Sequence, residues 1–167
     1  GGTVRDVILG LPVFWIVQPL YMIICAGVAL LTYFTAHLVE SRYKLLLWLD
    51  ALGLSAYCVL GAAKGLASTG SLTVAVIMGM LTAAFGGIMR DTLAGEPSVL
   101  LRPEIYVSAA MVGAVVYTLT ATLGLPPTAA ALIGMLAAFL IRAGAIRYGW
   151  TIPTYRSRPG RRPEDIQ

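Results

Sequence analysis

Charged residues are scarce in this chain: they make up 12% of its 167 residues, and histidine occurs once. The two cysteines, Cys25 and Cys58, lie in separate apolar stretches outside any metal-ligand spacing, so we interpret both as packing residues. The chain has no phosphate-binding Gly-Lys-Ser/Thr loop and no serine in a nucleophile-elbow setting. We therefore expect neither an enzyme nor a metal or cofactor site. The net charge of +4 is not gathered on a soluble domain, so we expect no binding to nucleic acid.

Apolar residues, in contrast, account for 58% of the chain, and the mean hydropathy is +0.82. A water-soluble core cannot bury that much apolar surface, whereas a membrane span needs roughly 20 mostly apolar residues. Five runs of this kind follow one another, at about 20–37, 45–67, 72–93, 105–123 and 128–146. We predict an all-α integral membrane protein, in which the third span is broken at Gly86-Gly87.

The basic residues between the spans predict the orientation. If successive spans alternate in direction, three basic segments fall on one side: the hinge with Arg42 and Lys44, the connection with Arg90 and Arg102, and the tail that follows Arg147. The connections on the other side contain no lysine or arginine. By the positive-inside rule, the carboxyl terminus is predicted to face the cytoplasm.

A twelve-residue motif occurs twice, 85 positions apart, beginning at Gly1 and again at Gly86, and it is identical at six of its twelve positions. Tyr21 and Tyr106 keep the same offset in the spans that follow. Each repeat unit has three spans, which is an odd number. Two consecutive units therefore lie in opposite orientations in the membrane, as in inverted-repeat transport proteins. The first copy lacks its leading span. We therefore expect roughly one and a half spans to precede Gly1 in the intact protein, so that this chain begins inside the second helix.

The paired glycines Gly1, Gly2, Gly86 and Gly87 are candidates for pore-lining kinks. Each weakens a helix by about 1 kcal/mol relative to alanine. Irregular backbone at membrane depth is tolerated only where it packs against protein or lines a watery cavity. For each glycine taken singly, close helix packing is as good an explanation as a cavity. Their recurrence ahead of Arg-Asp in both copies favours a cavity.

The charged pairs of the motif are candidate pore or gating residues: Arg5 with Asp6, and Arg90 with Asp91. Adjacent residues point about 100° apart on a helix, so we expect that they need not pair with each other. They either meet charges of the other copy across the pseudo-symmetry axis or end their helices at the lipid headgroups. An ionisable group deep in a span costs at least about 2.5 kcal/mol on insertion scales, which favours a function.

Lys64 is the strongest single candidate for a functional charge. It lies near the far end of the second apolar run, on the side that otherwise has no basic residues. The alternative is that it extends to the interface without a further role. Asp50, on the same run, lies too far from Lys64 for a direct bond, at about 21 Å by the helical rise.

Two copies of Gly-Gly-x-x-Arg-Asp-x-x-x-Gly-x-Pro, with Ala-Lys-Gly-Leu around Lys64, resemble the prokaryotic branch of the TRIC (trimeric intracellular cation) channel family. The resemblance covers residues 1 to about 150. It implies two inverted three-helix repeats plus a seventh helix, with glycine-kinked helices. It divides this chain into a remainder of the first repeat, the second repeat, a final transmembrane helix and a basic cytoplasmic tail, at 1–42, 43–124, 125–148 and 149–167.

The resemblance also implies a homotrimer in which each subunit has its own pore between the kinked helices, conducting K⁺ and, less selectively, Na⁺. Gly86 and Gly87 would kink the fifth helix, and Gly1 and Gly2 the second. Lys64 matches the lysine of the animal channels' Lys-Glu-Val motif, which is associated with voltage-dependent block, but here Gly65 and Leu66 follow it.

We predict a monovalent cation channel of the prokaryotic plasma membrane that contacts K⁺, Na⁺, membrane lipids and two further copies of itself. Bacterial proteins with this doubled motif are also described as small amino acid (glycine) transporters, and inverted repeats are typical of transporters as well. The first alternative is therefore a glycine transporter. The second is a non-conducting membrane scaffold, in which the glycines pack without a water-filled path.

Overall fold

The computed structural model describes residues 1–39, 43–94 and 105–150, without the side chains of residues 36–39, 43–46, 90, 93 and 94. All regular secondary structure in this part of the chain is helical. The helices are α1 (Gly2–Ile8), α2 (Phe14–Val17), α3 (Leu20–Val39), α4 (Tyr43–Thr69), α5 (Leu72–Ala94), α6 (Val107–Thr122) and α7 (Pro127–Tyr148).

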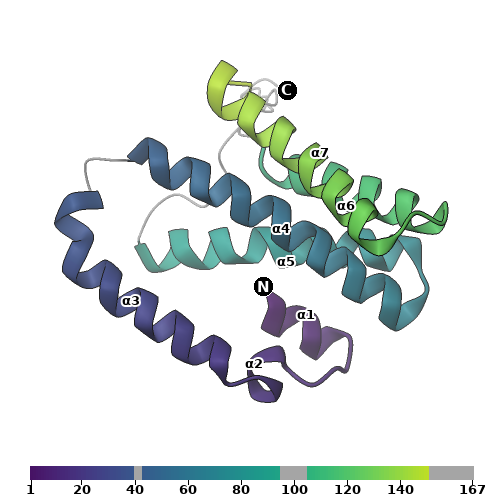
Figure 1. The fold of residues 1–167 in the computed structure, drawn as a ribbon, viewed down its shortest axis with the longest axis horizontal. Helices are drawn as coiled ribbons and strands as arrows, with labels where there is room; N and C mark the ends of the chain where they lie inside the picture. Colours follow the sequence, from purple (N-terminus) through teal and green to yellow (C-terminus); the bar gives the residue numbers. More distant parts are fainter. Residues whose placement is uncertain (40–42, 95–104, 151–167) are drawn as a thin grey trace, which may run out of the picture.

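Helices α4 to α7 form a bundle, in which α4 packs against the other three and α6 packs between α5 and α7 (Figure 1). The short helix α1 packs against α5, and α2 connects it to α3. In Figure 1, α3 runs along the edge of the molecule, away from α6 and α7. The apolar side chains of residues 20–34 on this helix are all exposed.

The bundle is held together by small residues at the helix contacts. The fully buried apolar residues are mostly alanines: Ala51, Ala62, Ala75, Ala109, Ala110, Ala114, Ala130 and Ala138. A Cβ atom placed on Gly79 of α5 would lie 2.6 Å from the Cys58 carbonyl oxygen of α4 and 2.7 Å from Ala114 Cβ of α6. Close backbone approach of this kind stabilises helix pairs in membranes, where lipid removes the hydrophobic drive.

The five apolar runs of the sequence coincide with α3 to α7, so these helices were predicted correctly. Three stretches of the described residues are long and apolar enough to cross a membrane: Leu47–Thr69, Leu72–Met89 and Pro127–Tyr148. Leu20–Thr35 and Val107–Thr122 are shorter apolar helices. The protein is thus an all-helical membrane protein. Its large lipid-facing side chains are exposed because their solvent is hydrocarbon.

The break that the sequence predicted at Gly86-Gly87 is absent, so this prediction was wrong. The helix α5 continues from Leu72 to Ala94 through both glycines without interruption. Two glycines weaken a helix, but the turns on either side here keep its hydrogen bonding.

The internal repeat extends to the long apolar helix that comes after each copy of the motif. After the first copy, α3 begins at Leu20, and after the second copy, α6 begins at Val107. The two starts differ by 87 positions, against 85 for the motif itself.

Candidate functional site

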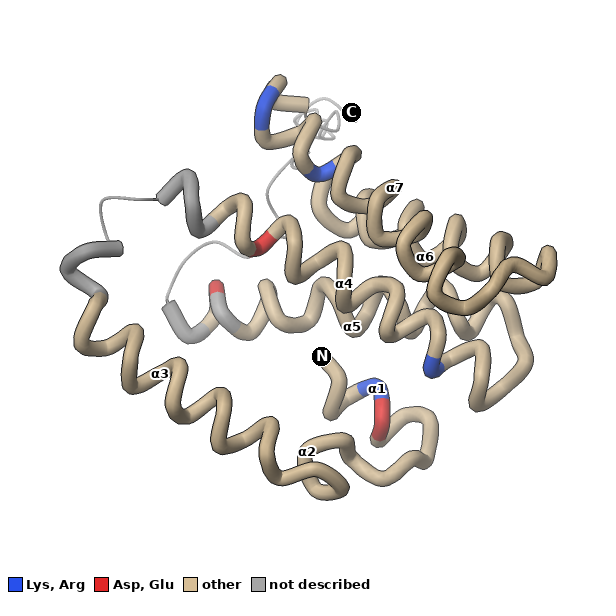
Figure 2. Tube along the Cα trace, viewed as in Figure 1, with Lys and Arg blue, Asp and Glu red and all other residues tan. Residues whose placement is uncertain are grey.

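Charged residues are sparse along the described helices, and several gather where α1 passes the end of α4 (Figure 2). The chain reverses directly after α1. Gly10 has a positive φ of 65°, its N–H donates to the Val7 carbonyl, and the N–H of Leu11 donates to the Asp6 carbonyl. This left-handed helix ending explains the third glycine of the motif. The reversal brings α2 back onto Asp6.

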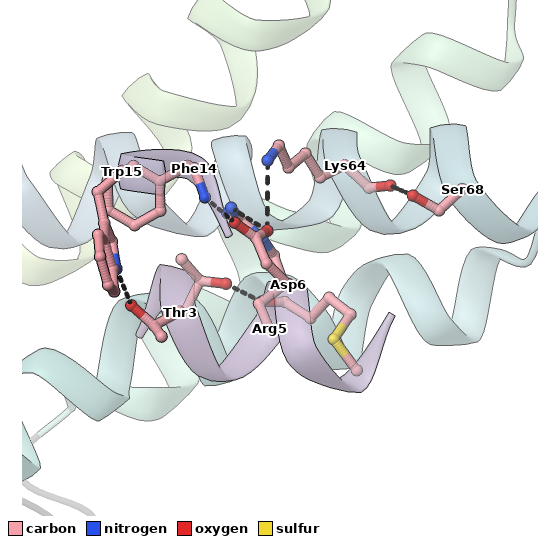
Figure 3. A network of polar contacts seen from close by, with 9 residues as sticks. Thr3, Arg5, Asp6, Phe14, Trp15, Lys64 and Ser68 are labelled. Carbon is pink, nitrogen blue, oxygen red and sulfur yellow. Dashed lines mark hydrogen bonds and ion pairs between the residues drawn. The ribbon is translucent and has the colours of Figure 1, made fainter. Parts of the chain in front are cut away.

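Asp6 lies at the centre of the site and is fully buried. Its Oδ1 accepts hydrogen bonds from Arg5 Nε and Nη2, at 2.9 and 2.7 Å, and from Lys64 Nζ at 3.3 Å. Its Oδ2 accepts a hydrogen bond from the Phe14 N–H at 3.0 Å. Figure 3 shows Lys64 reaching from α4 to the carboxylate of α1. Nearby, the Trp15 indole donates to the Thr3 hydroxyl, which joins α2 to α1.

The site contains two cationic side chains and one carboxylate. Arg5 is buried, whereas the side chain of Lys64 is 43% exposed. A buried charge is tolerated when it is paired and hydrogen-bonded, as Asp6 and Arg5 are. The ammonium group of Lys64 is the member of the cluster that can exchange its carboxylate contact for water.

Helix geometry does not require Arg5 and Asp6 to pair, but in the structure they do. A long guanidinium side chain reaches back to its neighbour's carboxylate although the two Cβ atoms diverge. Among the described residues, the interhelical ion pair of Asp6 is with Lys64 on α4. Asp91, its counterpart in the second copy, is also buried, and the side chain of Arg90 lies outside the described residues.

Three of the four paired glycines of the motif are closely packed. A Cβ on Gly1 would overlap the Thr82 carbonyl of α5, and one on Gly2 would lie 3.0 Å from Phe14 Cε1. A Cβ on Gly87 would lie 2.8 Å from the Tyr106 hydroxyl oxygen. At Gly86, no atom of the described residues outside the adjoining backbone lies within 4 Å of that position. Close packing thus accounts for Gly1, Gly2 and Gly87. It does not account for Gly86, which faces open space.

Comparison with known proteins gives the family. The chain matches the family model described as "Glycine transporter" over residues 1–37 and 47–122. It is 38% identical to a UPF0126 membrane protein of Vibrio cholerae, over 93% of this chain and 66% of that protein. It is 37% identical to the UPF0126 inner membrane protein YadS of Escherichia coli, over 93% of this chain and 76% of that protein.

The structure matches that of the TRIC trimeric intracellular cation channel orthologue from Rhodobacter sphaeroides, with a TM-score of 0.84 and 47% identity. The match covers 89% of this chain and 77% of the other. The chain belongs to the prokaryotic TRIC family. The chain spans about two thirds to three quarters of the length of these three relatives.

For this TRIC-family chain, the sequence identified Lys64, Arg5 and Asp6 individually but not their contact, because residues 58 positions apart in the chain give no local signal of proximity. It also missed Arg142 on α7, which is buried with its guanidinium Cζ 5.0 Å from the centre of the Tyr106 ring. The available signal was an arginine inside an apolar run, which is rare in membrane helices and marks an internal contact.

Proposed function

We propose that this protein is a cation channel that conducts K⁺ across the prokaryotic inner membrane. The observation that carries the proposal is the likeness, at 47% identity over 89% of this chain, to a protein whose structure is described as a TRIC cation channel. The relatives named as membrane or inner membrane proteins support the location. The basic loops support a cytoplasmic carboxyl terminus.

The Asp6 cluster supplies a chemical reason for cation passage. A carboxylate held at membrane depth attracts a cation, and Lys64 occupies that carboxylate with a tethered ammonium group at 3.3 Å. Because Asp6 is fully buried and Lys64 is partly exposed, a cation reaches the carboxylate only when Lys64 moves aside into water. In this mechanism, Lys64 limits the current, while Arg5 keeps Asp6 ionised and in place.

The pore is proposed to lie within each subunit, between the two copies of the motif, and the subunits are proposed to form a homotrimer. Gly86, which faces open space among the described residues, is the motif glycine that fits a pore lining. Arg90 and Asp91 would then line the second half of the path, as Arg5 and Asp6 line the first. Na⁺ would pass by the same route, and lipids would surround the trimer.

The test is reconstitution of the full-length protein into planar bilayers under a K⁺ gradient. Unitary currents that reverse near the K⁺ potential are expected. Lys64→Ala should change the current at a given voltage by roughly fivefold, since a unit charge about 4 Å from the ion contributes about 1 kcal/mol even at the dielectric constant of water.

Arg147→Ala, which removes an exposed positive charge at the end of α7, is the matched control and should leave the current unchanged. A wild-type protein that carries no current would refute the channel. Equal currents in wild type and Lys64→Ala would refute the role of Lys64.

A glycine carrier is the second candidate function, and one observation favours it. The cluster presents both signs of charge, so Lys64 and Asp6 together suit a zwitterion with a carboxylate and an ammonium group. Proteoliposomes that initially contain no glycine should then take up radiolabelled glycine in a saturable manner. Saturable uptake without bilayer currents would support the carrier. If the protein shows neither uptake nor currents, the remaining alternative is the non-conducting scaffold.

A further inference from the structure

Tyr106 lies where three helices meet. It directly precedes α6, is 2% exposed, and places its hydroxyl oxygen against Gly87 of α5. On α7, Arg142 is 3% exposed and its Cζ lies 5.0 Å from the centre of the Tyr106 ring. The same guanidinium donates through Nη1 to the carbonyl of Ile105 at 3.4 Å. Tyr106 therefore connects Gly87 of α5 to Arg142 of α7.

Gly87 and Gly86 differ in what surrounds them, although they are adjacent on one helix. A methyl group at Gly87 would lie 2.8 Å from the Tyr106 hydroxyl oxygen, a separation at which something must shift. The next nearest atom, Tyr106 Cζ, is 3.3 Å away, so the hydroxyl makes most of the conflict. The neighbour that a methyl group at position 87 would meet is thus the Tyr106 side chain and not the backbone of another helix.

Arg142 fixes the tyrosine from the other side. A guanidinium over an aromatic face is attracted to the ring, and more strongly where water is excluded. The hydrogen bond to Ile105 holds the residue just before the tyrosine. Ring and backbone at the start of α6 are therefore both bound to α7.

The first copy of the motif is built differently at the same place. There the second glycine, Gly2, lies against Phe14, whose ring packs edge-on against Tyr21 at 5.4 Å. Tyr21 corresponds to Tyr106 by the 85-residue offset but is 49% exposed. The guanidinium contact is thus a feature of the second copy, and α7, the helix left over by the two repeats, provides it.

We propose that Arg142 and Tyr106 are positioning residues, which brace α5 at Gly87 and so fix the part of α5 that carries Arg90 and Asp91. The part of the proposal that is tested by conduction rests on the proposed channel function. The contact itself is tested independently by unfolding of the purified full-length protein in detergent.

The unfolding test is a double-mutant cycle of wild type, Gly87→Ala, Tyr106→Phe and the two substitutions combined. Gly87→Ala should lower the melting temperature, and Tyr106→Phe in the same chain should recover at least half of that loss, because the substitution removes the conflicting oxygen. Gly86→Ala is the matched control for stability alone, since its methyl group meets open space, and it should not lower the melting temperature. Equal effects of the two alanines, or no recovery by Tyr106→Phe, would overturn the contact.

The conduction test separates positioning from a merely structural role. Arg142→Gln should change the open probability several-fold with unitary conductance unchanged, and Arg142→Lys should restore much of the wild-type value. Tyr57→Phe, which removes the hydroxyl of an exposed tyrosine on α4, is the control and should behave as wild type.

An Arg142→Gln protein that only folds in lower yield, with wild-type open probability, would overturn the brace. A wild-type protein without current would refute the channel, and with it the conduction part of the proposal, while the unfolding cycle would still decide the contact.

Discussion

Asp6 accepts four hydrogen bonds from three segments of the chain, so a single carboxylate connects α1, α2 and α4. Its two cationic neighbours differ in their surroundings, because Arg5 is buried and Lys64 is partly exposed. Removal of the shared carboxylate and removal of one exposed cation therefore have different consequences.

Asp6→Asn is expected to lower the free energy of unfolding by about 3 kcal/mol, because it leaves the buried guanidinium of Arg5 without its counter-charge. Lys64→Ala should cost no more than about 1 kcal/mol, since an exposed ammonium recovers hydration. Reversible unfolding in mixed detergent micelles measures both. A Lys64→Ala protein as unstable as Asp6→Asn would contradict this ranking.

The sequence identified most of the site residues but not how they are arranged. Arg5, Asp6 and Lys64 stand out because charges are rare in apolar runs. Their contact follows from the turn at Gly10, which folds α2 back over α1, and from the packing of distant helices. Gly86 and Gly87 look equivalent in sequence, and only the position of Tyr106 distinguishes them.

At the scale of elements, the sequence predicted α3 to α7 well because each is a long apolar run bounded by charges, prolines or glycines. It did not predict α2, whose four residues are too few for a periodic signal. It also predicted a break in α5 that is not there, because a glycine pair weakens a helix without ending it when neighbouring helices support it.

The contact between α6 and α7 allows a prediction about helix packing. A Cβ on Gly113 would lie 2.6 Å from Ala138 Cβ and 3.0 Å from the Gly134 carbonyl oxygen. Gly113→Ala should therefore lower the free energy of unfolding by about 1–3 kcal/mol through overpacking.

Gly53→Ala on α4 is the control, because no described atom outside the adjoining backbone lies within 4 Å of its Cβ position. It should raise the free energy of unfolding by up to about 1 kcal/mol through helix propensity. Chemical unfolding of the two variants side by side distinguishes packing from propensity. A stabilised Gly113→Ala protein would argue against the close approach of α6 and α7.

For the whole molecule, the distribution of lysine and arginine predicts one orientation in the membrane. A fluorescent protein fused to the carboxyl terminus of the full-length protein should fluoresce, because it folds in the cytoplasm, and alkaline phosphatase fused there should be inactive. A fusion within the loop at Gly124 should give the reverse pattern. Active phosphatase at the carboxyl terminus would contradict the predicted orientation.

The glycines and alanines between α4, α5, α6 and α7 also affect how the protein can change over generations. Where the resident residue is already glycine or alanine, nearly every amino-acid substitution adds volume, and added volume in a packed contact is destabilising. The contact surfaces between the helices should therefore tolerate fewer substitutions than the lipid-facing positions.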